Sequence, residues 1–247
     1  MKTALIDADI IMYRSSILTE DQEQEEAIRL ADDMILSWMS AADAEGHLCC
    51  LSSQLNFRKM WWPEYKQNRK DKPRPKHLSA VLEHIKSKHP YVVHPEWEAD
   101  DVIGFLHTHP LCADTVIVTI DKDLDQIPGR HCNPDKEENY TVLPDDAETY
   151  KWCQVLSGDT TDNYPGIRGI GHVKAMKILE DAAPGDYESI VRQVYTEKGH
   201  DEAFYNSMLA CATIIKFTKE IECDLLSQDT TTEHTLPAIL KSLHQFN

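Results

Sequence analysis

Short apolar runs alternate with amphipathic stretches along the first 144 residues of the chain. The runs predict buried strands, because they are too short for helices and are rich in strand-forming residues; we place them at 3–7, 47–52, 91–93, 115–120 and 140–143. Between them, apolar residues recur at helical spacing over 21–41 and 98–109. Strands that alternate with helices are typical of an α/β protein with a parallel sheet.

From about residue 145 the pattern becomes helical. Helices are predicted at 146–157, 171–181, 186–198 and 201–219, whereas residues 220–247 are weakly patterned. We therefore expect an α/β core over 1–144 and a helical region over 145–247. A chain of 247 residues is long enough to bury such a core without metal or disulfide staples.

Composition gives no reason to expect a membrane or an oxidising compartment. No apolar run reaches the roughly 18–20 residues that span a bilayer, and two aspartates interrupt the N-terminal stretch where a signal peptide would lie. The seven cysteines are odd in number and form no CxxC motif, which fits a reducing cytosol. We therefore expect a cytoplasmic protein with no membrane partner.

The formal net charge of −17 argues against a nucleic-acid partner, because Lys and Arg normally supply the phosphate contacts. The charge is uneven, however: residues 58–88 hold ten Lys and Arg against three acids. Four aromatic side chains lie in or beside this segment, namely Phe57, Trp61, Trp62 and Tyr65. Aromatic residues among cations suit stacking on unpaired bases beside phosphate contacts. The alternative is a solvated loop whose aromatic side chains pack on the core.

Acidic residues gather at the ends of four predicted elements. In an open parallel sheet, the carboxyl ends of the strands share one edge, where ligands bind. Carboxylates brought together there need cations between them, and Mg²⁺ and Mn²⁺ prefer such oxygen ligands. Two ions about 4 Å apart would promote phosphodiester hydrolysis. Any single cluster has a simpler interpretation, as a partner of a helix dipole. The clusters are Asp7 and Asp9; Glu98, Asp100 and Asp101; Asp121, Asp123 and Asp125; Asp159 and Asp162.

Residues 166–171 read GIRGIG and lead into the apolar and basic stretch HVKAMKIL. Glycines permit positive φ and a close approach of backbone, and the free N–H groups of a following helix can bind phosphate. The segment thus has the form of a helix–hairpin–helix that holds a DNA backbone without reading bases. Arg168, Lys174 and Lys177 add positive charge. A plain corner between two helices is the alternative.

Five segments occur in an informative order: LIDAD at 5–9, NFRK and PEYKQNRK within 56–70, EADDVIG at 98–104, TIDKDLDQIPG at 119–129 and SGDTTDNYPGIRGIG at 157–171. In this order the chain resembles the 5′→3′ exonuclease/flap endonuclease superfamily over about residues 3–180, and most of all its compact phage-encoded members. The resemblance implies a PIN-like three-layer α/β/α core with a central, mostly parallel sheet. It also implies a C-terminal helical region with a helix–hairpin–helix at 157–181, and a basic arch or clamp at 58–88 that admits a 5′ single strand.

The resemblance also assigns residues. It implies two Mg²⁺ or Mn²⁺ ions, the first held by Asp7, Glu98 and Asp100, the second by Asp121, Asp123, Asp159 and Asp162, with Asp101 as an additional acid. Asp7, Asp100 and Asp121 would act in catalysis, and Lys66 and Arg69 would touch the scissile phosphate. Tyr65 would stack on the terminal base. Further DNA contacts would come from Arg58, Lys70, Gly166, Arg168, Gly169, Gly171 and Lys174, and hairpin carbonyls would hold K⁺.

The implied activity is a metal-dependent 5′→3′ exonuclease and flap endonuclease, a monomer that acts on DNA with a 5′ end, flap or nick and on RNA–DNA hybrids. One position departs from the family: Ser53 stands where a further metal-binding aspartate is expected. A DNA-binding homologue with weakened or lost catalysis is therefore the main alternative. A phosphatase with Asp7 as nucleophile is a third, but it leaves the basic segment unexplained.

Overall fold

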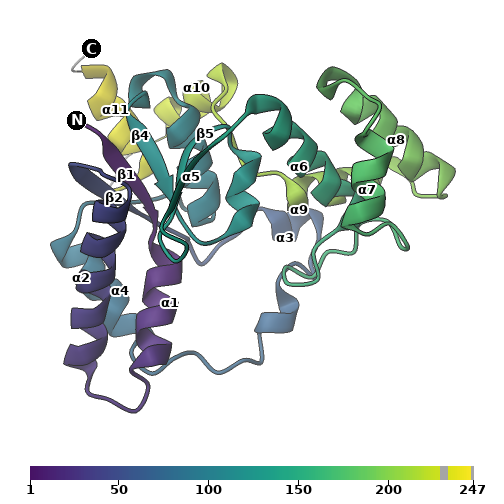
Figure 1. Cartoon of the computed structure of the whole chain (residues 1–247). Coiled ribbons are helices and arrows are strands. Elements are labelled where there is room, and N and C mark those ends of the chain that lie inside the picture. Colours follow the sequence, from purple (N-terminus) through teal and green to yellow (C-terminus); the bar gives the residue numbers. More distant parts are fainter. Residues whose placement is uncertain (229–232, 246–247) are drawn as a thin grey trace.

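A computed structural model describes residues 1–228 and 233–245 (Figure 1). Its centre is a six-stranded sheet in the order β3-β2-β1-β4-β5-β6, in which all neighbours are parallel except the antiparallel pair β5 and β6. The predicted parallel sheet is confirmed, and β5 is a strand that the sequence did not reveal. The strands are β1 (Thr3–Asp7), β2 (Gly46–Leu51), β3 (Tyr91–Val93), β4 (Thr115–Val118), β5 (Gly129–Asn133) and β6 (Glu138–Val142).

Helices cover both faces of the sheet, and alternate strand residues divide between them. Ala4 and Ile6 of β1 pack into an apolar cluster with α1 (Ala8–Leu18), α2 (Gln24–Ala41) and α4 (Leu78–Lys88). Leu5, between them, packs into a second cluster with α5 (Ala99–Thr108) on the opposite face. This period of two places both strand faces in apolar surroundings. The expected three-layer α/β/α arrangement is confirmed.

A third apolar cluster lies beside the sheet and is built by helices. Its elements are α6 (Pro144–Ser157), α7 (His172–Leu179), α8 (Tyr187–Glu197) and α9 (Glu202–Ala212), and these lie at one end of the molecule in Figure 1. The four predicted helices are therefore present, although the last one ends earlier than predicted, at Ala212.

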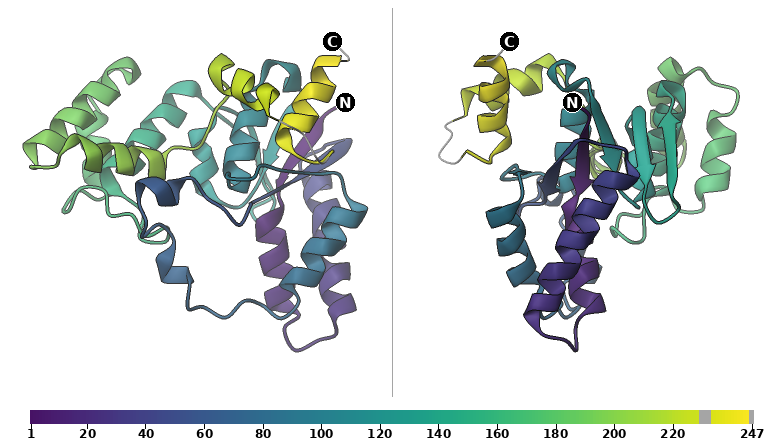
Figure 2. Two further views of the ribbon diagram at one scale, coloured as in Figure 1. Left: turned by 180° about the vertical axis from the view of Figure 1, so that it is seen from behind. Right: turned by 60° about the vertical axis from the view of Figure 1, so that its left-hand side comes forward.

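The chain then returns to the sheet. Helices α10 (Lys219–Ser227) and α11 (Leu236–Gln245) contribute Leu225, Leu236 and Leu240 to the same cluster as α5. Figure 2 shows these two helices on the N-terminal side of the molecule, away from α7 and α8. The expected helical region over 145–247 is thus divided, because its last part completes the α/β core. No helix among the described residues is long and apolar enough to cross a membrane.

The basic segment 58–88 is three structures in succession. Helix α3 (Arg58–Trp61) contacts α9, an exposed stretch around the 3-10 helix Gln67–Arg69 follows, and α4 packs on the sheet. In Figure 1 the intervening loop crosses below the sheet from the helical end to α4. Further short 3-10 helices are Pro110–Cys112, Lys122–Gln126 and Pro184–Asp186.

Candidate metal centre

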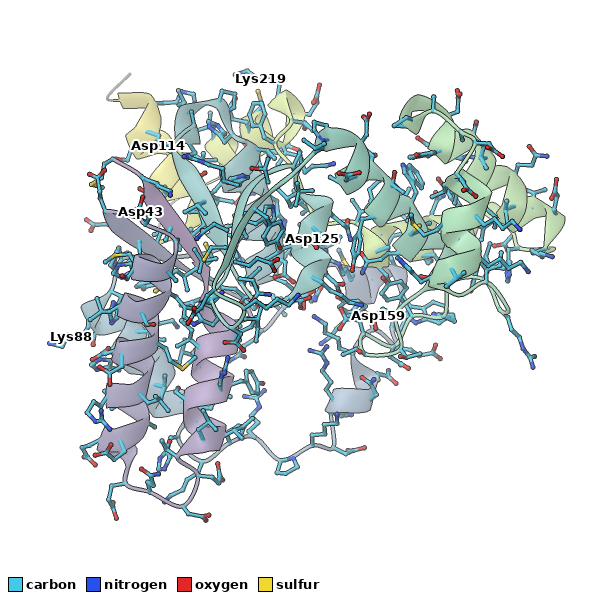
Figure 3. The ribbon with its side chains drawn as sticks, in the orientation of Figure 1. Asp43, Lys88, Asp114, Asp125, Asp159 and Lys219 are labelled. Carbon is cyan, nitrogen blue, oxygen red and sulfur yellow. The ribbon has the colours of Figure 1, made fainter. Side chains whose placement is uncertain are left out.

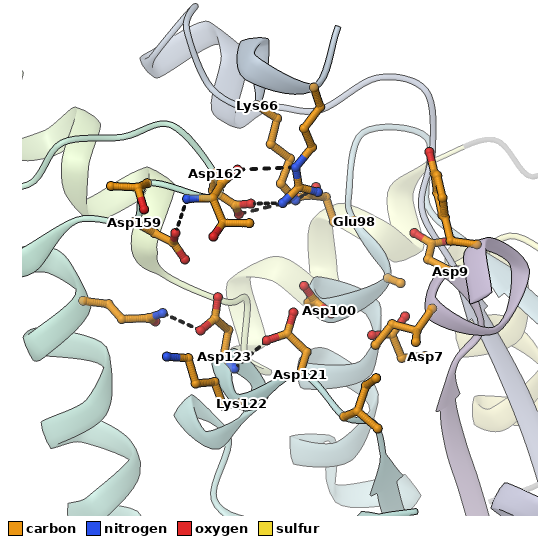
Figure 4. A pocket seen from close by; sticks show the side chains of 18 of the residues that line it. Asp7, Asp9, Lys66, Glu98, Asp100, Asp121, Lys122, Asp123, Asp159 and Asp162 are labelled. Atoms are coloured by element: carbon orange, nitrogen blue, oxygen red, sulfur yellow. Dashed lines mark hydrogen bonds and ion pairs between the residues drawn. The ribbon is translucent and has the colours of Figure 1, made fainter. Parts of the chain in front are cut away.

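A cavity of about 1250 Å³ opens beyond the carboxyl ends of β1 and β4. Figure 4 shows carboxylates that point into it from the strand ends, from the start of α5 and from the loop between α6 and α7. All four predicted acidic clusters therefore reach one cavity. The lining carboxylates are Asp7, Asp9, Glu98, Asp100, Asp121, Asp123, Asp159 and Asp162.

Local structure explains why these side chains converge. Asp7 is the last residue of β1, and Asp121 follows β4, its parallel neighbour. Glu98 is the N-cap residue of α5, and Asp100 lies in the first turn of that helix. Strand ends and helix N-termini thus face one space, in which backbone N–H groups also favour negative charge.

The loop between α6 and α7 closes the other side. A backbone bridge joins Asp159 to Tyr164, and it holds Asp159 and Asp162 within one tight turn. Asp123 faces them from the 3-10 helix after β4, where its Oδ1 accepts hydrogen bonds from Gln154 at 2.7 Å and Tyr150 at 3.2 Å. Gln154 and Tyr150 were not predicted, and they orient one of the carboxylates.

Burial and neighbouring negative charges raise the pKa of three carboxyl groups in the cavity. Burial, with the charges of Asp9 and Asp121, raises the pKa of Asp7 to about 8. Burial, with Asp7 and Asp121, raises the pKa of Asp100 well above its usual range. Burial and three acidic neighbours raise the pKa of Asp123 to about 7. Groups of this kind bind protons when no cation is near, and divalent cations compete with those protons.

Lys66 and Arg69 line the cavity, and their contact with a scissile phosphate stays a prediction. Lys66 Nζ is 2.5 Å from Glu98 Oε1 and 3.4 Å from Asp162 Oδ2, and Arg69 Nη2 is 2.5 Å from Asp162 Oδ1. Burial alone would raise the pKa of Glu98, but Lys66 and Arg58 outweigh it and lower that pKa to about 2. Lys66 and Arg69 therefore offset the negative charges of Glu98 and Asp162.

The structure differs from prediction for Arg58 and Asp101. Both side chains are buried, and the guanidinium forms a bidentate pair with the carboxylate at 2.6 and 2.7 Å. Asp101 also accepts from the backbone N–H of Glu98 and of Ile215. Asp101 therefore does not line the cavity, and Arg58 is not free to touch DNA. The pair joins α3 to α5 instead.

Tyr65 also differs from prediction. It is 2% exposed, and its hydroxyl lies 2.9 Å from Glu98 Oε2 and 2.7 Å from Asp162 Oδ2. Its ring packs in the apolar cluster of the helical region, so it cannot stack on a base. The alternative interpretation, in which aromatic residues of the basic segment pack on the core, is correct here. Trp61, in contrast, is 50% exposed, and Lys70 is exposed.

The serine that lies at the cavity beyond the end of β2, where the family is expected to have a metal-binding aspartate, is Ser52 rather than Ser53. Ser52 lines the cavity, and its Oγ accepts from the backbone N–H of Ala99. Ser53 points elsewhere, because its Oγ accepts from Leu55 N. The nearby carboxylate is Asp9, whose Oδ1 accepts from Ser52 N at 3.2 Å. Asp9 belongs to the predicted acidic clusters but not to the predicted metal-binding set, and the sequence pattern that indicates it is the Asp-x-Asp spacing across the junction of β1 and α1.

The glycines of the predicted hairpin have different surroundings. Gly166 has φ of 57° and is buried, and a Cβ there would lie 2.2 Å from the backbone N of Gly158. Gly166 therefore serves internal packing rather than contact with a partner. Gly169 and Gly171 are exposed, with open space around a Cβ at each. Arg168 of this loop and Lys174 and Lys177 of α7 are also exposed, so these three cations are accessible.

Comparison with known proteins agrees with this geometry. Residues 2–150 match the family model described as 5'-3' exonuclease, N-terminal resolvase-like domain. The chain is 31% identical over 140 residues to a flap endonuclease Xni of Shewanella baltica, covering 51% of this chain and 53% of that protein. It is 27% identical over 245 residues to DNA polymerase I of Caldicellulosiruptor bescii, covering 85% of this chain and 29% of the polymerase. The chain thus spans about half or less of these relatives.

Solved structures share the fold. The T5 D15 protein, co-crystallised with metal ions, superposes with a TM-score of 0.70 at 15% identity, covering 100% of this chain and 98% of that one. The catalytic core of Rad2 in complex with DNA substrate gives a TM-score of 0.52 at 15% identity, covering 99% and 86%. Because the family model covers more than half of the chain, the protein belongs to the family of 5'-3' exonucleases that have the N-terminal resolvase-like domain.

Proposed function

We propose that this protein is a metal-dependent 5′→3′ exonuclease and flap endonuclease that hydrolyses phosphodiester bonds of DNA by a two-metal mechanism. The observation behind the proposal is the convergence of eight carboxylates from four chain segments on one cavity that also contains Lys66 and Arg69. Relatives named as flap endonuclease and DNA polymerase I point the same way. The proposed substrates have a 5′ end, flap or nick, and RNA–DNA hybrids are a further class.

The donor set fits two hard divalent cations, Mg²⁺ or Mn²⁺, because every charged ligand is an oxygen. We assign Asp7, Asp9, Glu98 and Asp100 to the first ion, and Asp121, Asp123, Asp159 and Asp162 to the second. When bound, such ions lower the pKa of the attacking water and stabilise the leaving oxygen. Lys66 and Arg69 would then exchange their carboxylate partners for the phosphate and stabilise its developing charge.

DNA would reach the cavity along two basic surfaces. The exposed loop 67–76 contains Arg69, Lys70, Lys72, Arg74 and Lys76 beside a single acid, Asp71. The exposed hairpin face offers Arg168, Gly169, Gly171 and Lys174 for backbone contacts. We propose that this hairpin binds the duplex through its phosphates, with K⁺ at its carbonyls. Contacts of this type weaken steeply with salt.

A cleavage assay tests the function. The protein is incubated with Mg²⁺ and labelled DNA that has a 5′ flap or a nick, and the products are resolved by length. We expect cleavage that EDTA stops and that Asp121→Asn abolishes, because the substitution removes a charge at the cavity. Asp146→Asn, at an exposed position outside the cavity, is the matched control and should remain active. Cleavage that persists in Asp121→Asn would refute the assignment.

A DNA-binding homologue with little catalysis is the second candidate. Ser52 favours it, because a neutral hydroxyl stands at the cavity from the end of β2. In this case the protein would bind flap DNA with Ca²⁺ or Mg²⁺ but would cleave it slowly, and Ser52→Asp would increase the rate. Fast Mg²⁺-dependent cleavage by the natural chain would exclude it and would indicate that Asp9 supplies the charge instead.

A further inference from the structure

A second group of potential metal ligands lies outside the carboxylate cavity. Asp32 on α2, His84 on α4 and His89 at the end of α4 place their ligand atoms within 4.8 Å of one another. The neighbouring His47 is the second residue of β2, at the amino end of the parallel strands. The carboxylate cavity lies beyond the carboxyl ends of the strands, so the two sites lie at opposite ends of the strands. In Figure 3, Lys88 marks this end of α4, far from the labelled Asp159.

Both histidine side chains already contact the carboxylate of Asp32 through their Nε2 atoms. His84 Nε2 is 2.8 Å from Asp32 Oδ1 and 3.0 Å from Oδ2, and His89 Nε2 is 2.9 Å from Oδ1. A tetrahedral ion bound at about 2.0–2.1 Å needs ligand atoms about 3.3 Å apart. The nitrogen–oxygen separations would therefore widen by only a few tenths of an ångström, which side-chain rotation can supply.

His47 orients one of the ligands. Its Nε2 lies 3.0 Å from Nδ1 of His89, the nitrogen that faces away from Asp32. When an ion binds, His89 Nε2 would give up the proton that it shares with Asp32 Oδ1 and present a lone pair to the ion, while a proton on Nδ1 is donated to His47 Nε2. Metal-ligating histidines commonly have such a partner, which fixes the ring and its tautomer.

Charge and access also suit a cation. Among the described residues, Asp32 has no lysine or arginine partner; its partners are the two imidazoles. The side chains of His84, His89 and Asp32 are 19%, 11% and 37% exposed, which leaves a path from solvent.

A similar trio, His109, Glu222 and His244, is less suited to an ion. His109 and His244 both contact Oε1 of Glu222, and Lys219 Nζ lies 2.6 Å from its other oxygen, Oε2. The lysine therefore already supplies a positive charge to this carboxylate. The comparison favours the trio on α2 and α4.

We propose that Asp32, His84 and His89 bind one Zn²⁺-class transition-metal ion, with His47 as the orienting residue and the fourth position open to water. Two imidazoles and a carboxylate select such an ion over Mg²⁺. The bound ion would link α2 to the end of α4, the helix that follows the basic loop. This site is independent of the proposed nuclease function.

Equilibrium dialysis with Zn²⁺ tests the proposal. The measurement uses the full chain with His244→Ala, to remove the second trio, and with excess Mg²⁺, to occupy the carboxylate cavity. We expect His84→Ala/His89→Ala in this background to bind one Zn²⁺ fewer per chain. His47→Gln should keep the ion but bind it roughly 10–100-fold more weakly. His200→Ala is the control, because this single histidine stacks on Phe204 in the helical region and should change nothing.

Equal Zn²⁺ stoichiometry and affinity in the double variant and its parent would overturn the proposal. Circular dichroism without metal checks that the variants are folded. If the double variant unfolds, imidazole ¹⁵N shifts of His84 and His89 in the folded parent decide the question: a large Zn²⁺-dependent shift at both Nε2 atoms supports the site, and unchanged shifts overturn it.

Discussion

Removal of Arg58 should destabilise the fold without removing a DNA contact. Its guanidinium and the Asp101 carboxylate are 3% and 0% exposed, and they face each other at 2.6 and 2.7 Å. Arg58 also donates to the backbone carbonyls of Cys211 and Thr213. Loss of one partner from a buried pair leaves an uncompensated charge, which costs about 3–5 kcal/mol. Arg58→Met keeps the volume of the side-chain stem, so the measured loss reports the missing charge.

Asp101→Asn should cost less than Arg58→Met. Glu98 Oε2 lies 3.3 Å from Arg58 Nη1 and would still compensate part of the guanidinium charge. In the double variant neither charge is left alone, so its loss should be smaller than the sum of the two single losses. Urea unfolding by circular dichroism gives all three free energies. Arg69→Met is the matched control, because its side chain is 46% exposed and solvent-exposed ion pairs contribute only about 0–1 kcal/mol.

The same variants distinguish a structural pair from a metal site. We expect folded Asp101→Asn to bind Mn²⁺ with unchanged affinity, because its carboxylate does not line the cavity. Asp121→Asn should bind Mn²⁺ more weakly. Unchanged stability in Asp101→Asn together with weakened Mn²⁺ binding would refute the reasoning and return Asp101 to the metal-binding set.

Three further measurements follow from the structure. Above about pH 7, His94 and His107, whose pKa burial lowers to about 4, are neutral in both the folded and the unfolded state. In that range the raised pKa values of Asp7, about 8, and Asp123, about 7, mean that the metal-free folded state binds more protons than the unfolded state, so urea unfolding should show stability falling from about pH 7 to about pH 8, and Mg²⁺ should reverse the loss; a rise with pH would contradict this. Gly166→Ala should cost more than 1 kcal/mol in thermal unfolding, because its Cβ would lie 2.2 Å from a backbone nitrogen at a φ of 57°. Lys70→Ala should reduce the slope of log affinity against log salt for flap DNA by about 1, whereas Lys151→Ala, paired with Glu148, should leave the slope unchanged.

The sequence revealed the sheet and the acidic clusters because both are local patterns. A short apolar run followed directly by aspartate marks a strand end, and parallel strand ends meet at one edge. The same local patterns do not predict the direction in which each side chain points. Asp100 and Asp101 are consecutive on α5 and therefore point about 100° apart, one into the cavity and the other to Arg58.

Contacts between distant segments explain the other differences. The partners of Tyr65 lie 33 and 97 residues away in the sequence, so its burial has no local signal. Ser52 and Ser53 are adjacent, and a shift of one residue decides which of them faces the cavity. The return of α10 and α11 to the sheet was hidden by their weak patterning, because only a few residues of each helix enter the core.

The exposed loop after Arg69 is anchored at both ends to different parts of the molecule. Before it, Tyr65 is fixed in the helical cluster; after it, buried His77 lies 3.0 Å from the backbone oxygen of Gln22, at the turn between α1 and α2 (Figure 1). The largest distance that such a loop can span between its two fixed ends depends on its number of residues. Each doubling of a flexible loop costs only about 0.6 kcal/mol of closure entropy, whereas shortening it below the span between its anchors strains both cores. Insertions could therefore lengthen this loop at little cost to folding, and the number of its residues alone would set how far it extends from the sheet.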